Sequence, residues 1–142
     1  ILTNFAVNKG AIRVFGGSQK RPNIHIEDMA DLYLFLLQKE DAEIDGKIYN
    51  AGYENHTVMQ LAEMVKNVVG NDLTINVEPT DDPRSYHVSS DKIKLELGFQ
   101  PTHSIQDAVT DLVEAMKDGR LTDTMENPMY FNIKRMQDVD LK

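Results

Sequence analysis

The sequence predicts an α/β fold in which short strands alternate with amphipathic helices. Three observations support this: the spacing of apolar residues switches between alternation and a helical period, helix-capping signals recur, and glycines follow several predicted helices. The 142 residues fit one domain, and a 41% share of hydrophobic residues is enough for a packed core.

The first part of the chain is predicted to end a helix and then form two short strands. Residues 1–8 have the pattern of a helix end that Gly10 stops. Residues 11–15 alternate as a strand, residues 16–18 (Gly-Gly-Ser) form a turn, and residues 23–26 predict a second strand. Because the chain opens inside an element with an uncapped apolar residue, we expect it to be part of a longer protein.

A helix is predicted from Glu27 and Asp28 to about Lys39, because carboxylates at a helix start bind free N–H groups and favour the dipole. Gly46 then breaks the chain, and residues 47–51 predict another strand. The buried face of the helix is expected to consist of Met29, Leu32, Tyr33, Leu36 and Leu37.

Capping boxes predict two further helices, residues 57–69 opening with Thr-Val-Met-Gln and residues 104–117 opening with Ser-Ile-Gln-Asp. Residues 120–142 show no clear period and are expected to form a tail. The segment between the two helices is predicted to contain a strand at 73–77, a strand at 85–88 and a helix at 90–97.

Charge and composition exclude several classes of function. A net charge of −8 argues against general nucleic-acid binding. Segment 1–26 contains four basic residues and no carboxylate: Lys9, Arg13, Lys20 and Arg21. Segment 27–45 contains seven carboxylates, and its one basic residue is Lys39. A small anion would suit such a basic region better than a long polyanion, but composition alone favours a solvated charge pattern.

No membrane partner or secretion route is predicted. The apolar stretches are too short to cross a bilayer, and no secretory signal is visible. The absence of cysteine excludes disulfides and a cysteine–zinc site, and it suits a reducing compartment. We therefore expect a cytoplasmic protein.

The strongest functional signal is the segment from Val14 to Ala30, V-F-G-G-S-Q-K-R-P-N-I-H-I-E-D-M-A. Its glycine turn would let a ligand approach the backbone. Arg21 follows the turn, and the planar guanidinium fork suits a diphosphate. A hairpin with an exposed arginine is equally consistent with these residues alone.

This segment resembles the motif G-G-x-Q-x-R-P-x-I-H-V-x-D-x-A of the extended short-chain dehydrogenase/reductase superfamily, which contains NAD-dependent epimerases and dehydratases of nucleotide sugars. Residues 82–93 (D-P-R-S-Y-H-V-S-S-D-K-I) and 96–101 (E-L-G-F-Q-P) are similar to a second family block, D-x-R-S-Y-x-V-D-x-S-K-I…E-L-G-F-x-P. Residues 49–52 (Y-N-A-G) are a weaker third match. The resemblance extends to about Gly119 and does not single out one reaction.

The resemblance implies an architecture and a parent activity. Residues 1–119 would hold the last part of a Rossmann-type doubly wound sheet (about 22–50) and a small α/β substrate-binding lobe, followed by a tail at 120–142. The parent would be a homodimeric epimerase or dehydratase that binds NAD or NADP and a nucleoside-diphosphate sugar. A reductase or decarboxylase on the same scaffold and a non-catalytic nucleotide-binding module are the alternatives.

The resemblance also assigns substrate-binding residues. Arg21 and Arg84 would contact the diphosphate from its two sides, and Val14 and Phe15 would flank the nucleotide base. Asn50 follows a predicted strand, where open α/β sheets place ligands, although a turn-capping role fits it at least as well. The full set of candidates is Arg21, Arg84, Gln19, Val14, Phe15 and Asn50.

The catalytic groups of the family are expected to lie outside this chain, which alone would be inactive. No G-x-G-x-x-G loop occurs, so no cofactor-binding residue is assigned. Tyr130 and Lys134 match the spacing of the family's Tyr-x-x-x-Lys pair, but they follow the substrate blocks instead of preceding them, so we interpret the match as a coincidence.

No metal site is predicted. Asp28 is interpreted as a helix cap and His25 as a packed strand residue with a satisfied ring. The other histidines are scattered without the spacing of metal ligands.

Overall fold

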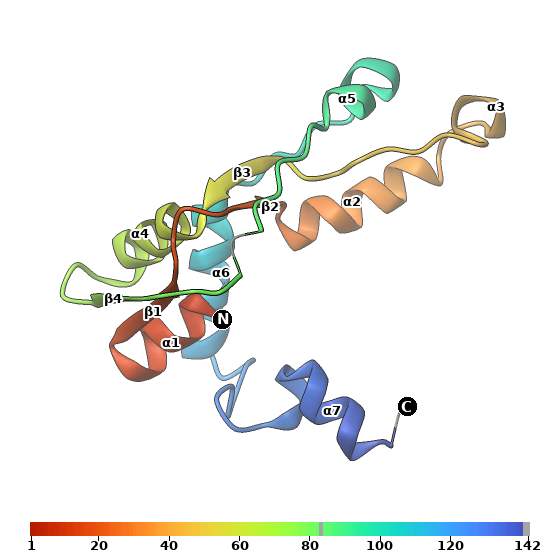
Figure 1. Ribbon diagram of the computed structural model, residues 1–142. Helices are drawn as coiled ribbons and strands as arrows, with labels where there is room; N and C mark the ends of the chain where they lie inside the picture. Colours follow the sequence, from red (N-terminus) through yellow and green to blue (C-terminus); the bar gives the residue numbers. More distant parts are fainter. Residues whose placement is uncertain (83, 141–142) are drawn as a thin grey trace.

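The computed structural model describes residues 1–82 and 84–140 and confirms the α/β class. Strands and helices gather in one body, a second group of helices projects from it as an arm, and the last helix lies apart from both (Figure 1). The elements of the body, in chain order, are α1 (Leu2–Lys9), β1 (Ala11–Phe15), β2 (Lys20–Asn23), β3 (Glu54–Thr57), α4 (Val58–Val69), β4 (Thr74–Glu78) and α6 (Ile105–Lys117).

The body is built around a parallel pair of strands. β1 pairs with β4 in the register Ala11↔Thr74 to Phe15↔Glu78. The chain between these strands includes α4, as the crossover of a parallel pair requires. Helices α1, α4 and α6 pack around this pair, and the core they bury consists of Ala6, Ile12, Val14, Ala62, Val65, Leu73, Val109 and Val113.

Local signals set the ends of these helices where the sequence predicted them. Gly10 ends α1 with φ 63°, a left-handed conformation that glycine adopts without strain. At the start of α4, Thr57 Oγ1 accepts the N–H of Gln60 at 3.1 Å, and Gln60 Oε1 accepts the N–H of Thr57 at 2.8 Å. Ser104 and Asp107 form the same reciprocal pair at the start of α6, so both capping boxes are confirmed.

The second sheet is an antiparallel pair, with β2 opposite β3 in the register Lys20↔Thr57 to Asn23↔Glu54. The strand predicted at 23–26 therefore lies too far along the chain, because Ile26 already begins a helix. The predicted strands at 47–51 and 85–88 are wrong. A strand needs a ladder partner, and neither segment has one within the described residues.

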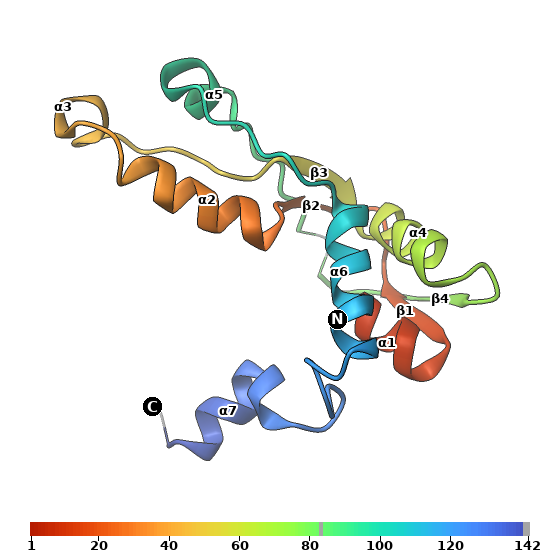
Figure 2. The ribbon, with the colours of Figure 1, turned by 180° about the vertical axis from the view of Figure 1, so that it is seen from behind.

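The arm consists of α2 (Ile26–Leu36), α3 (Asp41–Ile44) and α5 (Asp91–Leu97), and it projects from the body in both views (Figures 1 and 2). Leu32, Ile93 and Leu97 form its small core. The predicted buried face of α2 is only partly correct, because Tyr33 is 64% exposed and Leu37 is 83% exposed. Only one side of α2 packs against this core, so these two side chains face outward.

The segment predicted as a tail contains a 3₁₀ turn (Pro128–Tyr130) and α7 (Asn132–Asp138), which the sequence pattern did not indicate. Its first part is attached to the body. The carbonyl of Thr124 accepts a hydrogen bond from Asn4 Nδ2 at 2.9 Å, and the N–H of Leu121 donates to the carbonyl of Ala115 at 3.0 Å.

None of the helices among the described residues is both long and apolar enough to span a bilayer.

Candidate functional site

The glycine turn between β1 and β2 is a braced structure. Gly16 and Gly17 have φ values of 74° and 113°, which favour glycine. Gln19 Oε1 accepts the N–H of Gly17 at 2.7 Å, and its Nε2 donates to the carbonyl of Phe15 at 2.6 Å. A Cβ on Gly16 would lie 2.5 Å from Thr80 Cγ2. The almost fully buried Gln19 side chain thus stabilises the turn through these two hydrogen bonds, and the turn sets the direction in which β2 leaves β1.

The Arg21 side chain contacts the backbone of Arg84, a residue 63 positions later in the sequence. Arg21 Nη1 donates to the carbonyl of Arg84 at 2.7 Å and to the carbonyl of Lys20 at 2.8 Å. The Arg21 guanidinium also lies over the ring of Tyr86, with Cζ 5.4 Å from the ring centroid. Within the described residues its hydrogen bonds involve Nη1 alone, so Nε and Nη2 are available to a ligand.

The carboxylate of Asp82 already occupies the guanidinium group of Arg84. Arg84 Nε and Nη2 bind the Asp82 carboxylate as a fork, at 2.6 and 2.7 Å. This hydrogen bonding, with a smaller contribution from the charge of Arg21, lowers the pKa of Asp82 to about 2. The carboxylate therefore stays ionised near two guanidinium groups, and any anionic ligand must compete with it.

His56 and Glu54 stand on the same side of the second sheet as Arg21. Arg21 is paired with His56 across β2 and β3, and directly opposite side chains share a face. The Glu54 carboxylate contacts His56 Nε2. Sequence reasoning missed this pair, because only the register of β2 on β3 brings it beside the arginine.

The other substrate-binding candidates, Val14, Phe15 and Asn50, differ from one another in burial and in contacts. The Val14 side chain is fully buried in the body core, so it does not present a surface to a nucleotide base. Phe15 is 45% exposed, and the guanidinium of Arg13 lies over its ring. Asn50 is exposed in a segment that is not a strand, so the strand end predicted before it is not formed.

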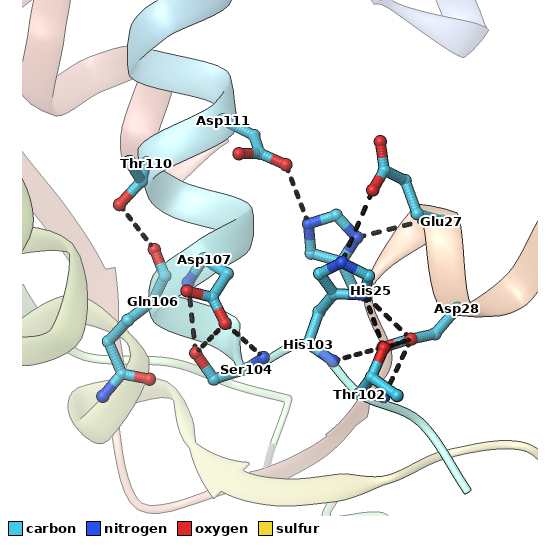
Figure 3. Close-up of polar contacts among 10 residues, drawn as sticks. All are labelled: His25, Glu27, Asp28, Thr102, His103, Ser104, Gln106, Asp107, Thr110 and Asp111. Atoms are coloured by element: carbon cyan, nitrogen blue, oxygen red, sulfur yellow. Dashed lines mark hydrogen bonds and ion pairs between the residues drawn. The ribbon is translucent and has the colours of Figure 1, made fainter.

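Asp28 is not a helix cap, contrary to the sequence interpretation. Its carboxylate is 2% exposed and accepts hydrogen bonds from Thr102 and His103, which precede α6 (Figure 3). Burial raises the pKa of Asp28, but these hydrogen bonds outweigh burial and hold the pKa below its ordinary value. Asp28 therefore ties the arm to the body.

His25 takes the capping role at the start of α2. It is 2% exposed, and its Nδ1 accepts the N–H of Glu27 at 3.1 Å. The expected burial of His25 is confirmed, but the expected satisfied ring is wrong. Nε2 lies 3.2 Å from Asp111 Oδ2 in a direction unsuited to a hydrogen bond, and it has no other partner among the described residues.

Tyr130 and Lys134 lie in the C-terminal segment, around α7. The Lys134 ammonium is 4.6 Å from the ring centroid of Phe131. Tyr130, Phe131 and Lys134 line a cavity of about 890 Å³ together with apolar residues of α1 and α6. The interpretation of the Tyr-x-x-x-Lys spacing as a coincidence stays a prediction.

Comparisons with known sequences agree with the family resemblance. A model of the NAD dependent epimerase/dehydratase family matches residues 1–52. UDP-glucose 4-epimerase of Corynebacterium glutamicum is 34% identical over 91 residues, covering 62% of this chain and 27% of that protein. UDP-glucuronic acid decarboxylase 1 of Danio rerio is 25% identical over 120 residues, covering 80% and 28%. The chain thus spans little more than a quarter of the length of these relatives.

Solved structures share the fold at low sequence identity. L-threonine dehydrogenase from Phytophthora infestans matches with a TM-score of 0.72 and 13% identity, over 84% of this chain and 40% of that one. UDP-glucuronic acid 4-epimerase from Bacillus cereus, in complex with UDP-glucuronic acid and NAD, matches with a TM-score of 0.70 and 20% identity, over 82% and 38%. The motifs, the family model over residues 1–52 and these relatives thus support the resemblance of the chain to the NAD-dependent epimerases and dehydratases of the extended short-chain dehydrogenase/reductase superfamily.

Proposed function

We propose that this chain supplies the surface that holds the nucleoside diphosphate in a nucleotide-sugar epimerase or dehydratase. The observation that carries the proposal is the contact of Arg21 Nη1 with the backbone carbonyl of Arg84 at 2.7 Å, beside the Asp82 carboxylate that Arg84 binds and whose pKa the charge of Arg21 also lowers. Guanidinium groups bind phosphate oxygens through paired, charge-assisted hydrogen bonds. Two such groups suit the two phosphates of a nucleoside diphosphate.

The surroundings of the arginines support the same role. The Tyr86 ring lies against the Arg21 guanidinium, which orients its plane and leaves Nε and Nη2 for a ligand. Asp82 occupies Arg84 in a fork geometry that a phosphate can also adopt. A diphosphate carries more charge than this single carboxylate, so binding would exchange Asp82 for the ligand at Arg84.

The names of the relatives support a nucleotide sugar as the substrate. One curated relative acts on UDP-glucose by its name, and a structural neighbour was solved with UDP-glucuronic acid and NAD. A decarboxylase is the second candidate, because UDP-glucuronic acid decarboxylase 1 matches 80% of this chain. Product analysis of the intact protein with UDP-glucose and UDP-glucuronic acid separates epimerisation from loss of carbon dioxide.

The residues of this chain do not fit a dinucleotide site. The sequence lacks a G-x-G-x-x-G loop, and the space beside Gly16 is filled by Thr80 and Gln19. We therefore propose that the cofactor and the reacting groups are held outside this chain, which would be inactive alone. In this proposal residues 1–119 are the Rossmann remnant and substrate lobe, and residues 120–142 are a tail.

Calorimetric titration of the intact protein with UDP tests the proposal. Arg21→Ala and Arg84→Ala should each weaken UDP binding about 10-fold or more, because a hydrogen bond to a charged group contributes about 1.5–3 kcal/mol. Arg135→Ala, which removes an exposed arginine of α7, should leave it unchanged. NAD binding should be unaffected in all three variants. Unchanged UDP affinity in both test variants would contradict the proposal.

A further inference from the structure

Three potential metal ligands converge where α2 meets α6 (Figure 3). His25 and Glu27 lie at the start of α2, and His103 lies just before α6. One ligand atom from each residue lies within 4.8 Å of the other two. The imidazole rings of His25 and His103 are stacked, with centroids 4.6 Å apart. The fold alone creates this cluster, because its two histidines are far apart in the sequence.

The proton of His103 is placed by Asp28. His103 Nδ1 lies 2.9 Å from Asp28 Oδ1, and an ionised carboxylate can only accept, so Nδ1 carries the proton. In the neutral ring the lone pair is then on Nε2, which lies 3.5 Å from Glu27 Oε2. A carboxylate on one ring nitrogen and a lone pair on the other is the arrangement that metal-binding histidines commonly show.

His25 repeats this arrangement with other partners. Its Nδ1 accepts the Glu27 N–H at 3.1 Å and therefore has the lone pair, whereas Nε2 carries the proton 3.2 Å from Asp111 Oδ2. This Nε2 is the buried polar atom without a hydrogen-bond partner among the described residues. A cation at Nδ1 would replace the Glu27 N–H contact, and a small turn of the ring would give Nε2 the Asp111 carboxylate as its partner.

The charges around the cluster favour a cation. Asp28, Asp107 and Asp111 surround the two imidazoles together with Glu27. These carboxylates outweigh the partial positive charge of the two helix N-termini. A cavity of about 600 Å³ reaches His25 and Glu27 of the cluster, and Asp111 and the cationic Arg120 also line it.

We propose that His25, Glu27 and His103 bind a transition-metal cation of the Zn²⁺ class. Two imidazole nitrogens and one carboxylate oxygen are ligands that Zn²⁺ accepts, and a water molecule would complete four-coordination. Asp28 and Asp111 would orient the two imidazoles from outside. The ion would fasten α2 to α6, and with them the arm to the body. The sequence, whose histidines have no ligand spacing, predicted no metal here.

Titration of the intact protein with Zn²⁺ after chelator treatment, followed by calorimetry, tests this site. We expect wild type to bind one equivalent per chain that Glu27→Gln and His103→Gln each lose or bind at least about 10-fold more weakly. Asp111→Asn should weaken the same equivalent about 10-fold to 100-fold. His87→Gln, which changes an exposed histidine outside the cluster, should bind as wild type does.

A loss of Zn²⁺ binding in these variants should not result from misfolding, and a second measurement checks the same site. Glu27 and His103 are partly exposed, and His103→Gln retains the backbone N–H contacts to Asp28, so these variants should fold. Zn²⁺ should also raise the unfolding temperature of wild type more than that of His103→Gln. Binding of equal strength and stoichiometry in wild type and both ligand variants, or no binding by wild type, would overturn the proposal.

Discussion

Replacing Asp28 by alanine should loosen the attachment of the arm to the body. The Asp28 carboxylate accepts the N–H groups of Thr102 and His103 at 2.9 and 3.0 Å, and also Thr102 Oγ1 at 3.1 Å and His103 Nδ1 at 2.9 Å. Asp28 is 2% exposed, so water cannot take over as acceptor of these hydrogen bonds unless the surrounding residues rearrange. Asp28→Ala removes the carboxylate and leaves its four hydrogen-bond donors without this acceptor.

The expected loss of stability follows from the kinds of donor. The hydroxyl of Thr102 and the partly exposed ring of His103 can turn toward water, whereas the two backbone N–H groups are held by the chain. A hydrogen bond to a charged group contributes about 1.5–3 kcal/mol, so losing the two backbone bonds should lower the free energy of unfolding by about 3–5 kcal/mol. Asp28→Asn keeps one acceptor oxygen and should lose about half as much.

Urea unfolding of the intact protein, combined with hydrogen exchange at the amides of Thr102 and His103, measures this effect. Asp31→Ala is the matched control, because Asp31 is exposed on the same helix, and its change should stay within about 0.5 kcal/mol of wild type. If Asp28→Ala shifts the unfolding free energy by less than about 1 kcal/mol and both amides keep their protection, the attachment described here is refuted.

Two further predictions concern the proposed diphosphate surface. Asp82→Asn should strengthen UDP binding several-fold in calorimetry, because it removes the competing anion from Arg84. The pKa of Asp82 is lowered to about 2, so its ion pair is complete above its ordinary pKa and is lost only as the pH falls toward 2. The gain should therefore be equal at about pH 8 and about pH 9, where the terminal phosphate of UDP, with its second ionisation near pH 6, is also fully ionised. A gain confined to one of these pH values would contradict this role of Asp82. Gly16→Ala should lower the unfolding free energy by about 2 kcal/mol more than Gly10→Ala in urea titration, since both glycines have positive φ but only Gly16 has neighbours, Thr80 and Gln19, in the way of a Cβ. Equal losses would show that Thr80 and Gln19 move aside without a measurable cost.

Elements with local signals could be predicted from the sequence. The capping box at Thr57 and the stop at Gly10 act through residues within one helical turn, so the pattern and the structure agree. Strands depend on a partner elsewhere in the chain. This is why β2 was placed too late and why residues 47–51 and 85–88, which have no ladder partner among the described residues, were wrongly predicted as strands.

In the candidate site, too, features carried by a short motif could be predicted, whereas contacts between distant segments could not. The family motifs indicate Arg21 and Arg84, and in the structure the Arg21 side chain contacts the Arg84 backbone carbonyl, whereas the shared role of their guanidinium groups stays a prediction. The contact of Asp28 with Thr102 crosses 74 residues, so its position in a first helical turn suggested a cap instead. Neither the pairing of His56 with Arg21 nor the occupation of Arg84 by Asp82 could be derived, because both depend on register and loop geometry.

A crystal structure of the intact protein with bound UDP would test the shared arginine surface most directly. We expect diphosphate oxygens within hydrogen-bond distance of both the Arg21 and the Arg84 guanidinium groups, with the Asp82 carboxylate displaced from Arg84. A diphosphate bound away from both arginines, with the Asp82–Arg84 fork intact, would contradict it.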